Sequence, residues 1–475
     1  MKDLLESEFA QMELKGLPLS FFEDNRKRFF SLIKMRLKEF DNNSLLVLKA
    51  GDAIPKYDTD VDYYYFFQEA NIYYLTGVKE PSLNCVVDFS NEKITLFYHE
   101  DDEETKVWQK VVTAKEIEEK YGLKTENKAS LNDWILSRNP NKLHVIEGKN
   151  DMSGLDVPSY KFDFSDEKYK SLREKVTSLP EIYQVLKESR KEKTLKEIEL
   201  MKFICKVSNQ AHIQMMKEMK PNQYERDVEN VFNNFMSENF YTRIWGYPCI
   251  GACGVNAATL HYEINTKKIL DGELFLADMG MRFCNYVSDV TITVPVNGKF
   301  TKKQKEIYDL CLDTNRTVMK MVKPGVNFRE LDTESKRLIL VGLQKLDLIS
   351  QKASISEMME KRIWYYFMPH GLGHHVGIEV HDVTTISYLG NESNLLREGN
   401  IITIEPGIYF REFLLKKGFE DETAKLYLNK EKLETYFDFG GVRIEDDVLV
   451  TSDSFLNMNA DLPRTTEEIE LIMKK

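Results

Sequence analysis

The segment ELFLADMGMRFCNYVSDVTITV carries two aspartates, Asp278 and Asp289, each within an apolar run. A turn at Phe283-Cys284 would fold this segment into an antiparallel hairpin and place the two carboxylates directly opposite each other on one face. Two buried carboxylates at that spacing repel each other and are costly to desolvate, and a cation between them removes both problems. The alternative is a pair of surface acids beside a turn, but the apolar residues on both sides weigh against it.

Histidines are concentrated in a second segment, FMPHGLGHHVGIEVHDV, which holds four of the eight in the chain. The Gly-Leu-Gly between His370 and His374 argues against the helix that an H-E-x-x-H zinc site requires, so we expect extended or looped backbone. GLGHHVG could be mistaken for a dinucleotide fingerprint, but that motif needs a helix to follow it, whereas IEVHDV is typical of a strand. This density of histidines favours a functional site, with His375 as the bystander.

Two glutamates complete the set of candidate ligands. Glu405 ends an apolar strand in NIITIEPGIYF, and Glu445 in FGGVRIEDDVLV is expected to share a strand face with Arg443. Four carboxylates with one imidazole suit two divalent ions such as Mn²⁺, Co²⁺, Fe²⁺ or Zn²⁺. Two such ions about 3.5–4 Å apart can hold a bridging hydroxide and polarise a carbonyl group.

These residues need a scaffold of strands and helices. In the second half of the chain, Gly-containing strands alternate with helices, one of them predicted over 301–322 with a capping box at Thr301 and Gln304 and a stop at Pro324-Gly325. In the first half we expect a helix over 113–122 and strands over 44–51, 62–67, 71–77, 84–90, 93–99, 144–148 and 161–165. This interleaving favours an α/β layer fold. A charged helical stretch interrupted by Pro180 marks a domain boundary, giving domains of 1–178 and 179–475.

Composition narrows the functional classes. The chain has 475 residues and a formal net charge of −12, which argues against a nucleic-acid partner. The segment MKDLLESEFAQMELKG lacks the apolar core of a secretory signal, and no apolar run is long enough to span a membrane. Six scattered cysteines fit reduced thiols better than a disulfide framework, so we expect a cytoplasmic protein without a membrane partner.

Taken in order, these motifs resemble those of the pita-bread metallopeptidases, which include methionine aminopeptidase, aminopeptidase P, prolidase and creatinase. The resemblance is greatest to the prolidase branch and runs from TDVDYYYFFQEANIYYLTGVKEP to the tail LPRTTEEIE. It implies an α/β (α+β) protein with an N-terminal creatinase-like domain and a C-terminal pita-bread catalytic domain. It also implies two bound divalent ions, with Mn²⁺ first and Co²⁺, Zn²⁺ or Fe²⁺ as alternatives. The ligands it implies are Asp278, Asp289, His374, Glu405 and Glu445.

The resemblance assigns roles to further residues. His261 and Tyr409 are expected to line the substrate pocket, and Arg443 to support a metal-binding glutamate. His370 and His381 are expected to contact the substrate and stabilise the tetrahedral intermediate. From the chemistry of the reaction we also expect Glu405 to carry a proton from the water to the leaving nitrogen. Trp108 resembles a tryptophan that reaches the partner subunit's active site in dimeric prolidases, which implies a homodimer.

Three functions remain open. The first is a prolidase, in which a hydroxide bridging two metals attacks the Xaa-Pro bond of dipeptides with a C-terminal proline. The second is an aminopeptidase P acting on longer Xaa-Pro peptides. It is considered because prolidases usually carry a carboxylate-binding arginine between VHDV and EPG, where this chain has only Arg397. The third is a non-enzymatic pita-bread scaffold, against which the full set of ligand types argues.

Overall fold

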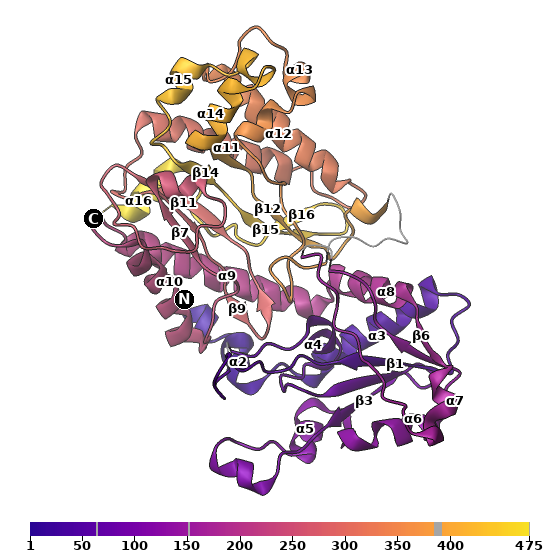
Figure 1. The fold of residues 1–475 in the computed structure, drawn as a ribbon. Helices are drawn as coiled ribbons and strands as arrows, with labels where there is room; N and C mark the ends of the chain where they lie inside the picture. The colour runs from indigo at the N-terminus through magenta and orange to yellow at the C-terminus, as the bar shows by residue number, and fades with distance from the viewer. Residues whose placement is uncertain (63–64, 151–152, 384–391, 475) are drawn as a thin grey trace. The chain divides into compact units, whose positions relative to one another are not determined.

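The structure is a computed structural model that describes residues 1–62, 65–150, 153–383 and 392–474 (Figure 1). The chain forms two compact units, and we describe each by itself. The large unit comprises residues 1–16, 191–382 and 394–475, and the small unit comprises 17–190 and 383–393. The predicted domain boundary after residue 178 refers to domains that fold separately, and it stays a prediction.

The small unit is built on a mixed sheet. Among its described residues, six strands are ordered β4-β3-β2-β1-β5-β6, with β1 antiparallel to β2 and parallel to β5. The strands are β1 (Ser44–Lys49), β2 (Asn84–Asp88), β3 (Lys93–Tyr98), β4 (Lys124–Asn127), β5 (Lys142–Val145) and β6 (Val176–Ser178). The helices are α3 (Leu19–Arg36), α4 (Ala70–Thr76), α5 (Ala114–Tyr121), α6 (Leu131–Arg138), α7 (Lys170–Arg173) and α8 (Pro180–Lys191), which ends in the large unit. Val47, Val86 and Phe97 are fully buried and form part of the core between the sheet and α6.

Two strand predictions in the small unit are wrong. Residues 71–77 form most of helix α4, in which every residue from Asn71 onward is buried. The Glu69 side chain accepts a hydrogen bond from the Ile72 N–H, and Gly77 ends the helix with a φ of 73°. A helix buried on all sides lacks a polar face, so its sequence does not show helical periodicity. Residues 161–165 form no strand. In the predicted strand 62–67, residues 65–67 form no strand either, and residues 63–64 lie outside the described residues.

The large unit is built from short antiparallel sheets and helices. Within the described residues its sheets are ordered β11-β8-β7 and β12-β15-β16, with β9–β10 and β13–β14 as separate pairs. The strands are β7 (Ile250–Cys253), β8 (Leu274–Asp278), β9 (Arg282–Phe283), β10 (Tyr286–Val287), β11 (Thr291–Pro295), β12 (Ile401–Ile404), β13 (Gly407–Tyr409), β14 (Gly441–Arg443), β15 (Asp446–Val450) and β16 (Phe455–Asn457). The helices are α1 (Lys2–Leu5), α2 (Met12–Lys15), α9 (Leu195–Glu218), α10 (Glu225–Phe240), α11 (Lys302–Met319), α12 (Phe328–Lys345), α13 (Ile355–Glu360), α14 (Glu412–Glu420), α15 (Lys430–Glu434) and α16 (Thr466–Met473).

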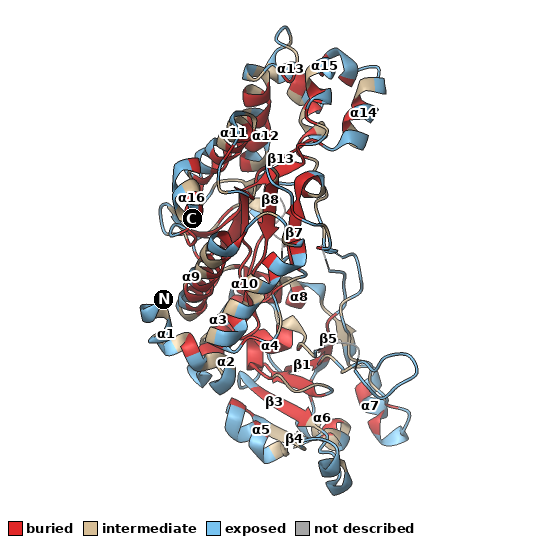
Figure 2. Ribbon diagram, turned by 90° about the vertical axis from the view of Figure 1, so that its left-hand side faces the viewer, coloured by how far each residue is buried: buried red, intermediate tan, exposed pale blue. Residues whose placement is uncertain are grey.

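Helix pairs cover the strands of the large unit. Helix α10 packs against β7, and α11 packs against β12, β13 and β14. Strands β7 and β8 are buried, whereas the outer surfaces of the helices are exposed (Figure 2). The predicted capping box of α11 is confirmed: the Thr301 side chain accepts from the Gln304 N–H, and the Gln304 side chain accepts from the Thr301 N–H. The predicted mixed α/β architecture is confirmed as well.

No helix in the described part of the chain combines the length and the apolar character that crossing a bilayer demands.

Candidate metal centre

The hairpin that carries the two aspartates forms, but its predicted register is wrong. Asp278 pairs with Thr291, and Asp289 lies two residues before the start of β11. The turn is centred on Cys284 and Asn285, whose φ angles of 48° and 63° are both positive. Two-residue hairpin turns with positive φ at both positions match the twist of the strands, and asparagine tolerates this conformation well. The turn therefore lies one residue later than predicted, and the two carboxylates are not directly opposite each other.

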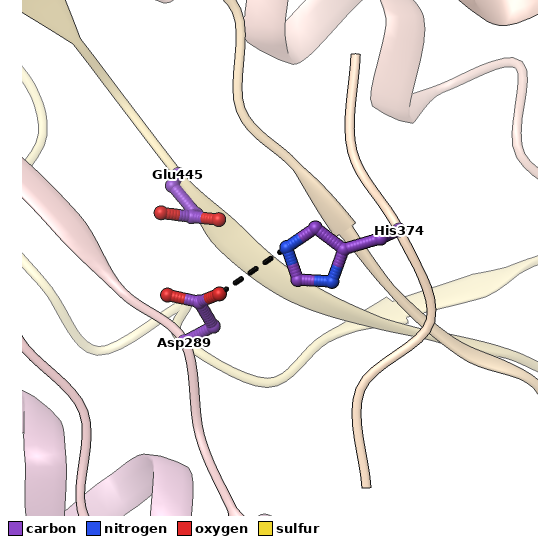
Figure 3. A group of neighbouring side chains, drawn as sticks. All are labelled: Asp289, His374 and Glu445. Atoms are coloured by element: carbon purple, nitrogen blue, oxygen red, sulfur yellow. Dashed lines mark ion pairs between the residues drawn. The ribbon is translucent and has the colours of Figure 1, made fainter. Parts of the chain in front are cut away.

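Three predicted ligands converge on one point (Figure 3). Asp289, His374 and Glu445 each offer one ligand atom, and these atoms lie within 4.8 Å of one another. The His374 Nε2 is 3.3 Å from the Asp289 Oδ2 and 3.4 Å from the Glu405 Oε1, so Glu405 belongs to the same cluster. One imidazole nitrogen and several buried carboxylate oxygens form a donor set that suits a divalent cation.

Asp278 is fixed at the edge of this cluster by two donors. The Tyr247 hydroxyl donates to its Oδ1 at 2.7 Å, and the Arg443 Nη2 donates to its Oδ2 at 2.7 Å. Its negative charge also raises the pKa values of Asp289 and Glu445. The structure therefore brings all five predicted ligands into one buried region.

Burial and like charge act together on these carboxyl groups. Burial, reinforced by the charge of Asp278, raises the pKa of Asp289, and burial raises the pKa of Glu405 to about 7 although His374 opposes it. Burial, with the charges of Asp289 and Glu405, raises the pKa of Glu445 well above its usual range. Burial lowers the pKa of His374, but a hydrogen bond with Asp289 and the charge of Glu405 outweigh this and raise it to about 9. A cation would relieve this excess of buried negative charge.

Threonine hydroxyls and one asparagine form hydrogen bonds to the predicted ligands or to the residues that precede them. The Thr291 hydroxyl donates to the Glu445 Oε2 at 2.6 Å, and the Thr403 hydroxyl donates to the Glu405 Oε1 at 3.3 Å. The Thr403 Oγ1 in turn accepts the backbone N–H of His374 at 3.0 Å. The Asn315 Nδ2 on α11 lies 2.8 Å from the carbonyl oxygen of Ile404 and 3.3 Å from that of Ile444, the residues that precede the two glutamates.

Residues with predicted substrate roles border the cluster. The Tyr409 hydroxyl lies 3.0 Å from the His370 Nε2 and accepts from the Arg443 Nη1 at 3.0 Å. Arg443 is linked to Glu445 through Thr291, whose hydroxyl accepts from the Arg443 Nε at 3.2 Å and donates to Glu445. The charge of Arg443 also lowers the pKa of Glu445. The His381 ring centroid is 4.4 Å from that of His374.

Other predicted features lie outside the metal cluster itself, although His261 is near enough to act on His370 and His381. His261 lies on an exposed turn of the large unit, and its charge lowers the pKa values of His370 and His381. Trp108 belongs to the small unit and is 87% exposed. The looped backbone expected between the histidines is confirmed, but the strand expected at 378–383 is wrong, because residues 378–381 form bends and residues 382–383 form no strand. Arg397 pairs with Glu192 at 3.2 Å, while residues 384–391, in the same loop, lie outside the described residues.

Comparison with known proteins settles the family. Residues 199–452 match metallopeptidase family M24, and residues 22–142 match the aminopeptidase P N-terminal domain. The chain belongs to metallopeptidase family M24. The resemblance to pita-bread metallopeptidases that we inferred from the motifs is thereby confirmed.

Relatives of this M24 peptidase match it over nearly its whole length. The Xaa-Pro dipeptidase of Mus musculus is 35% identical and covers 97% of this chain and 94% of its own. The Xaa-Pro dipeptidase of Homo sapiens is 32% identical and covers 97% of this chain and 94% of its own. The aminopeptidase PepP of Pseudomonas aeruginosa has a similar structure, with a TM-score of 0.79, 26% identity, and coverage of 97% of this chain and 99% of its own.

The motifs of this M24 peptidase did not reveal every residue of the cluster. Thr291 and Thr403 each lie two residues from a predicted ligand, so the period-two rule for strands could have placed them on the same face. Tyr247 could not be found in this way, because it lies in the irregular segment before β7 and reaches Asp278 only through the fold.

Proposed function

We propose that the chain is a prolidase: a metal-dependent hydrolase that cleaves the Xaa-Pro bond of dipeptides with a C-terminal proline. The observation that carries the proposal is the convergence of Asp289, His374 and Glu445, with Glu405 beside them. In our proposal these residues and Asp278 hold two divalent ions, Mn²⁺ first among Mn²⁺, Co²⁺, Zn²⁺ and Fe²⁺. When bound, such ions polarise a carbonyl group and lower the pKa of water.

Glu405 is the carboxylate best suited to carry a proton. Its side chain is 17% exposed, compared with 13% for Asp278 and 6% for Asp289, and Glu445 is almost fully buried. A group that takes a proton from water and delivers it to a leaving nitrogen must reach both. The proline nitrogen must gain a proton to leave as an amine, because an amide anion is a poor leaving group.

Hydrogen bonding decides whether His370 or His381 is the better donor to the oxyanion. The His370 Nδ1 lies 2.7 Å from the Gly371 carbonyl oxygen, which can only accept, so Nδ1 carries the hydrogen. The His370 Nε2 then accepts from the Tyr409 hydroxyl, which accepts from Arg443. A neutral His370 therefore has no N–H left for an oxyanion. Burial lowers the pKa of His381 to about 4, so a neutral His381 is the better candidate for that hydrogen bond.

A second function is supported by the lack of an evident carboxylate-binding arginine between the VHDV and EPG motifs. Arg397, the only arginine between VHDV and EPG, pairs with Glu192. Without a carboxylate clamp in that loop, an aminopeptidase P activity on longer Xaa-Pro peptides is the alternative.

Hydrolysis of Gly-Pro and of Arg-Pro-Pro by the metal-loaded chain separates these functions. Cleavage of Gly-Pro alone supports the prolidase proposal. Cleavage of Arg-Pro-Pro supports the aminopeptidase alternative. If neither peptide is cleaved with Mn²⁺, Co²⁺ or Zn²⁺, the proposal is wrong and the scaffold hypothesis stands.

A further inference from the structure

Arg411 lies on the segment that leads from Glu405 through β13 to α14. Two residues before it, Tyr409 is buried in a hydrophobic cluster with Ala257 and Ala258, and its hydroxyl lies 3.0 Å from the His370 Nε2. Arg411 itself is exposed, and two residues of extended chain span about 7 Å. The Arg411 Cα therefore lies about 7 Å from that of Tyr409.

A second contact fixes Arg411 on the side of the predicted substrate pocket. Its Nη1 donates to the Thr259 Oγ1 at 2.6 Å, and Thr259 lies two residues before His261. The segments 257–262 and 407–411 thus meet twice, once through the buried ring of Tyr409 and once through the exposed Arg411–Thr259 hydrogen bond.

The charge of Arg411 is not neutralised within the described chain. No carboxylate among the described residues forms an ion pair with it, and the acid next to it, Glu412, pairs with Lys416 at 2.6 Å. Two other cations near His370 are already engaged, because Arg443 pairs with Asp278 and Lys336 pairs with Asp332. A guanidinium has five N–H donors, and the single neutral hydroxyl of Thr259 leaves a pair of them for a carboxylate.

We propose that Arg411 binds the C-terminal carboxylate of a dipeptide substrate and thereby selects dipeptides. The inference rests on the proposed prolidase function. In a dipeptide the carboxylate belongs to the residue directly after the scissile bond, so a cation at the pocket edge can hold it. In a longer peptide an uncharged amide occupies the same position. Arg411 would thus bind the carboxylate in place of Arg397, which pairs with Glu192.

The test compares Gly-Pro with glycyl-prolinamide, which differs only in the terminal charge. For Arg411→Met we expect the KM for Gly-Pro to rise roughly tenfold to hundredfold, as for loss of a hydrogen bond to a charged group. The KM for the amide should change little, and kcat should stay similar for both substrates. Lys416→Met is the matched control, because it removes a positive charge from the adjacent helix, and it should change neither KM.

Arg411 is exposed and its side chain does not cap α14, so the variant is expected to fold. If it does not fold, Arg411→Lys should still shift the ratio of the two KM values in the same direction, by a smaller factor. An unchanged ratio in an active Arg411→Met enzyme overturns this inference and leaves the prolidase proposal standing. Failure of the wild type to cleave Gly-Pro overturns both.

Discussion

At the scale of the residue, the cluster places like charges close together and supports each with a specific hydrogen bond. Thr291, Thr403 and Tyr247 hold Glu445, Glu405 and Asp278 respectively. Such partners orient ligands before a metal binds, which reduces the ordering that binding requires. Arg443 pairs with Asp278, and its charge also lowers the pKa values of Glu405 and Glu445. One arginine and His374 still leave the four carboxylates with an excess of negative charge when all are ionised.

Replacing Asp289 with asparagine should lower bound metal and peptidase activity together. The substitution keeps the size of the side chain but removes the charge that faces His374. Metal content by plasma mass spectrometry and Gly-Pro hydrolysis measure the two effects. Asp309→Asn, on the exposed surface of α11, is the control and should change neither. Unchanged metal content in the Asp289 variant would show that the ligand assignment is wrong.

Replacing Tyr247 with phenylalanine should weaken metal binding by roughly tenfold to hundredfold, the usual effect of losing a partner that orients a ligand. The variant removes only the hydroxyl that donates to Asp278. Calorimetric titration of the metal-free chain with Mn²⁺ gives the affinity, and near-ultraviolet circular dichroism checks that the fold is kept. Wild-type affinity in this variant would mean that Tyr247 does not orient Asp278.

At the scale of the element, the sequence identified what is local and missed what depends on the fold. The capping box of α11 lies within one helical turn, so Thr301 and Gln304 were sufficient to predict it. The hairpin between Asp278 and Asp289 was predicted as well, but its register depends on which residues accept a positive φ, and Cys284 carries no such signal. Helix α4 was predicted as a strand because a short, fully buried apolar run has the same pattern in either state. The five candidate ligands were predicted because each lies in a recognisable sequence motif, although His374 lies on a loop and three of the carboxylates lie just outside a strand.

Strand β5 contains a buried histidine that should make the small unit sensitive to acid. His144 stacks on Phe40, and neither of its ring nitrogens has a hydrogen-bond partner among the described residues. Burial, reinforced by Lys142 and opposed by Asp41, lowers its pKa from 6.5 to about 4. Between these values the unfolded chain binds a proton that the folded chain does not, so stability should fall as the pH falls.

In His144→Gln, the free energy of unfolding should therefore depend less steeply on pH between about 4 and 6.5, by up to about one proton. Urea denaturation across this range measures the slope. His99→Gln, an exposed histidine in the same unit, should retain the wild-type slope. An equal slope in His144→Gln and the wild type would contradict the assignment.

At the scale of the whole molecule, both units match domains of known peptidases, and the relatives span nearly the whole chain. The candidate metal centre is built entirely within the large unit. The expected homodimer, the role of Trp108 in it and the cytoplasmic location stay predictions. The net charge of −12 counts four carboxylates that, in our proposal, are neutralised by metal.

Metal-dependent cleavage of an Xaa-Pro dipeptide is the central claim, and one titration tests it most directly. Gly-Pro hydrolysis is followed while Mn²⁺ is added stepwise to the chelator-treated chain. We expect no turnover without metal, and activity that rises to a plateau at two equivalents of Mn²⁺ per chain. Turnover in the metal-free chain, or a plateau at a single equivalent, would contradict the dinuclear account.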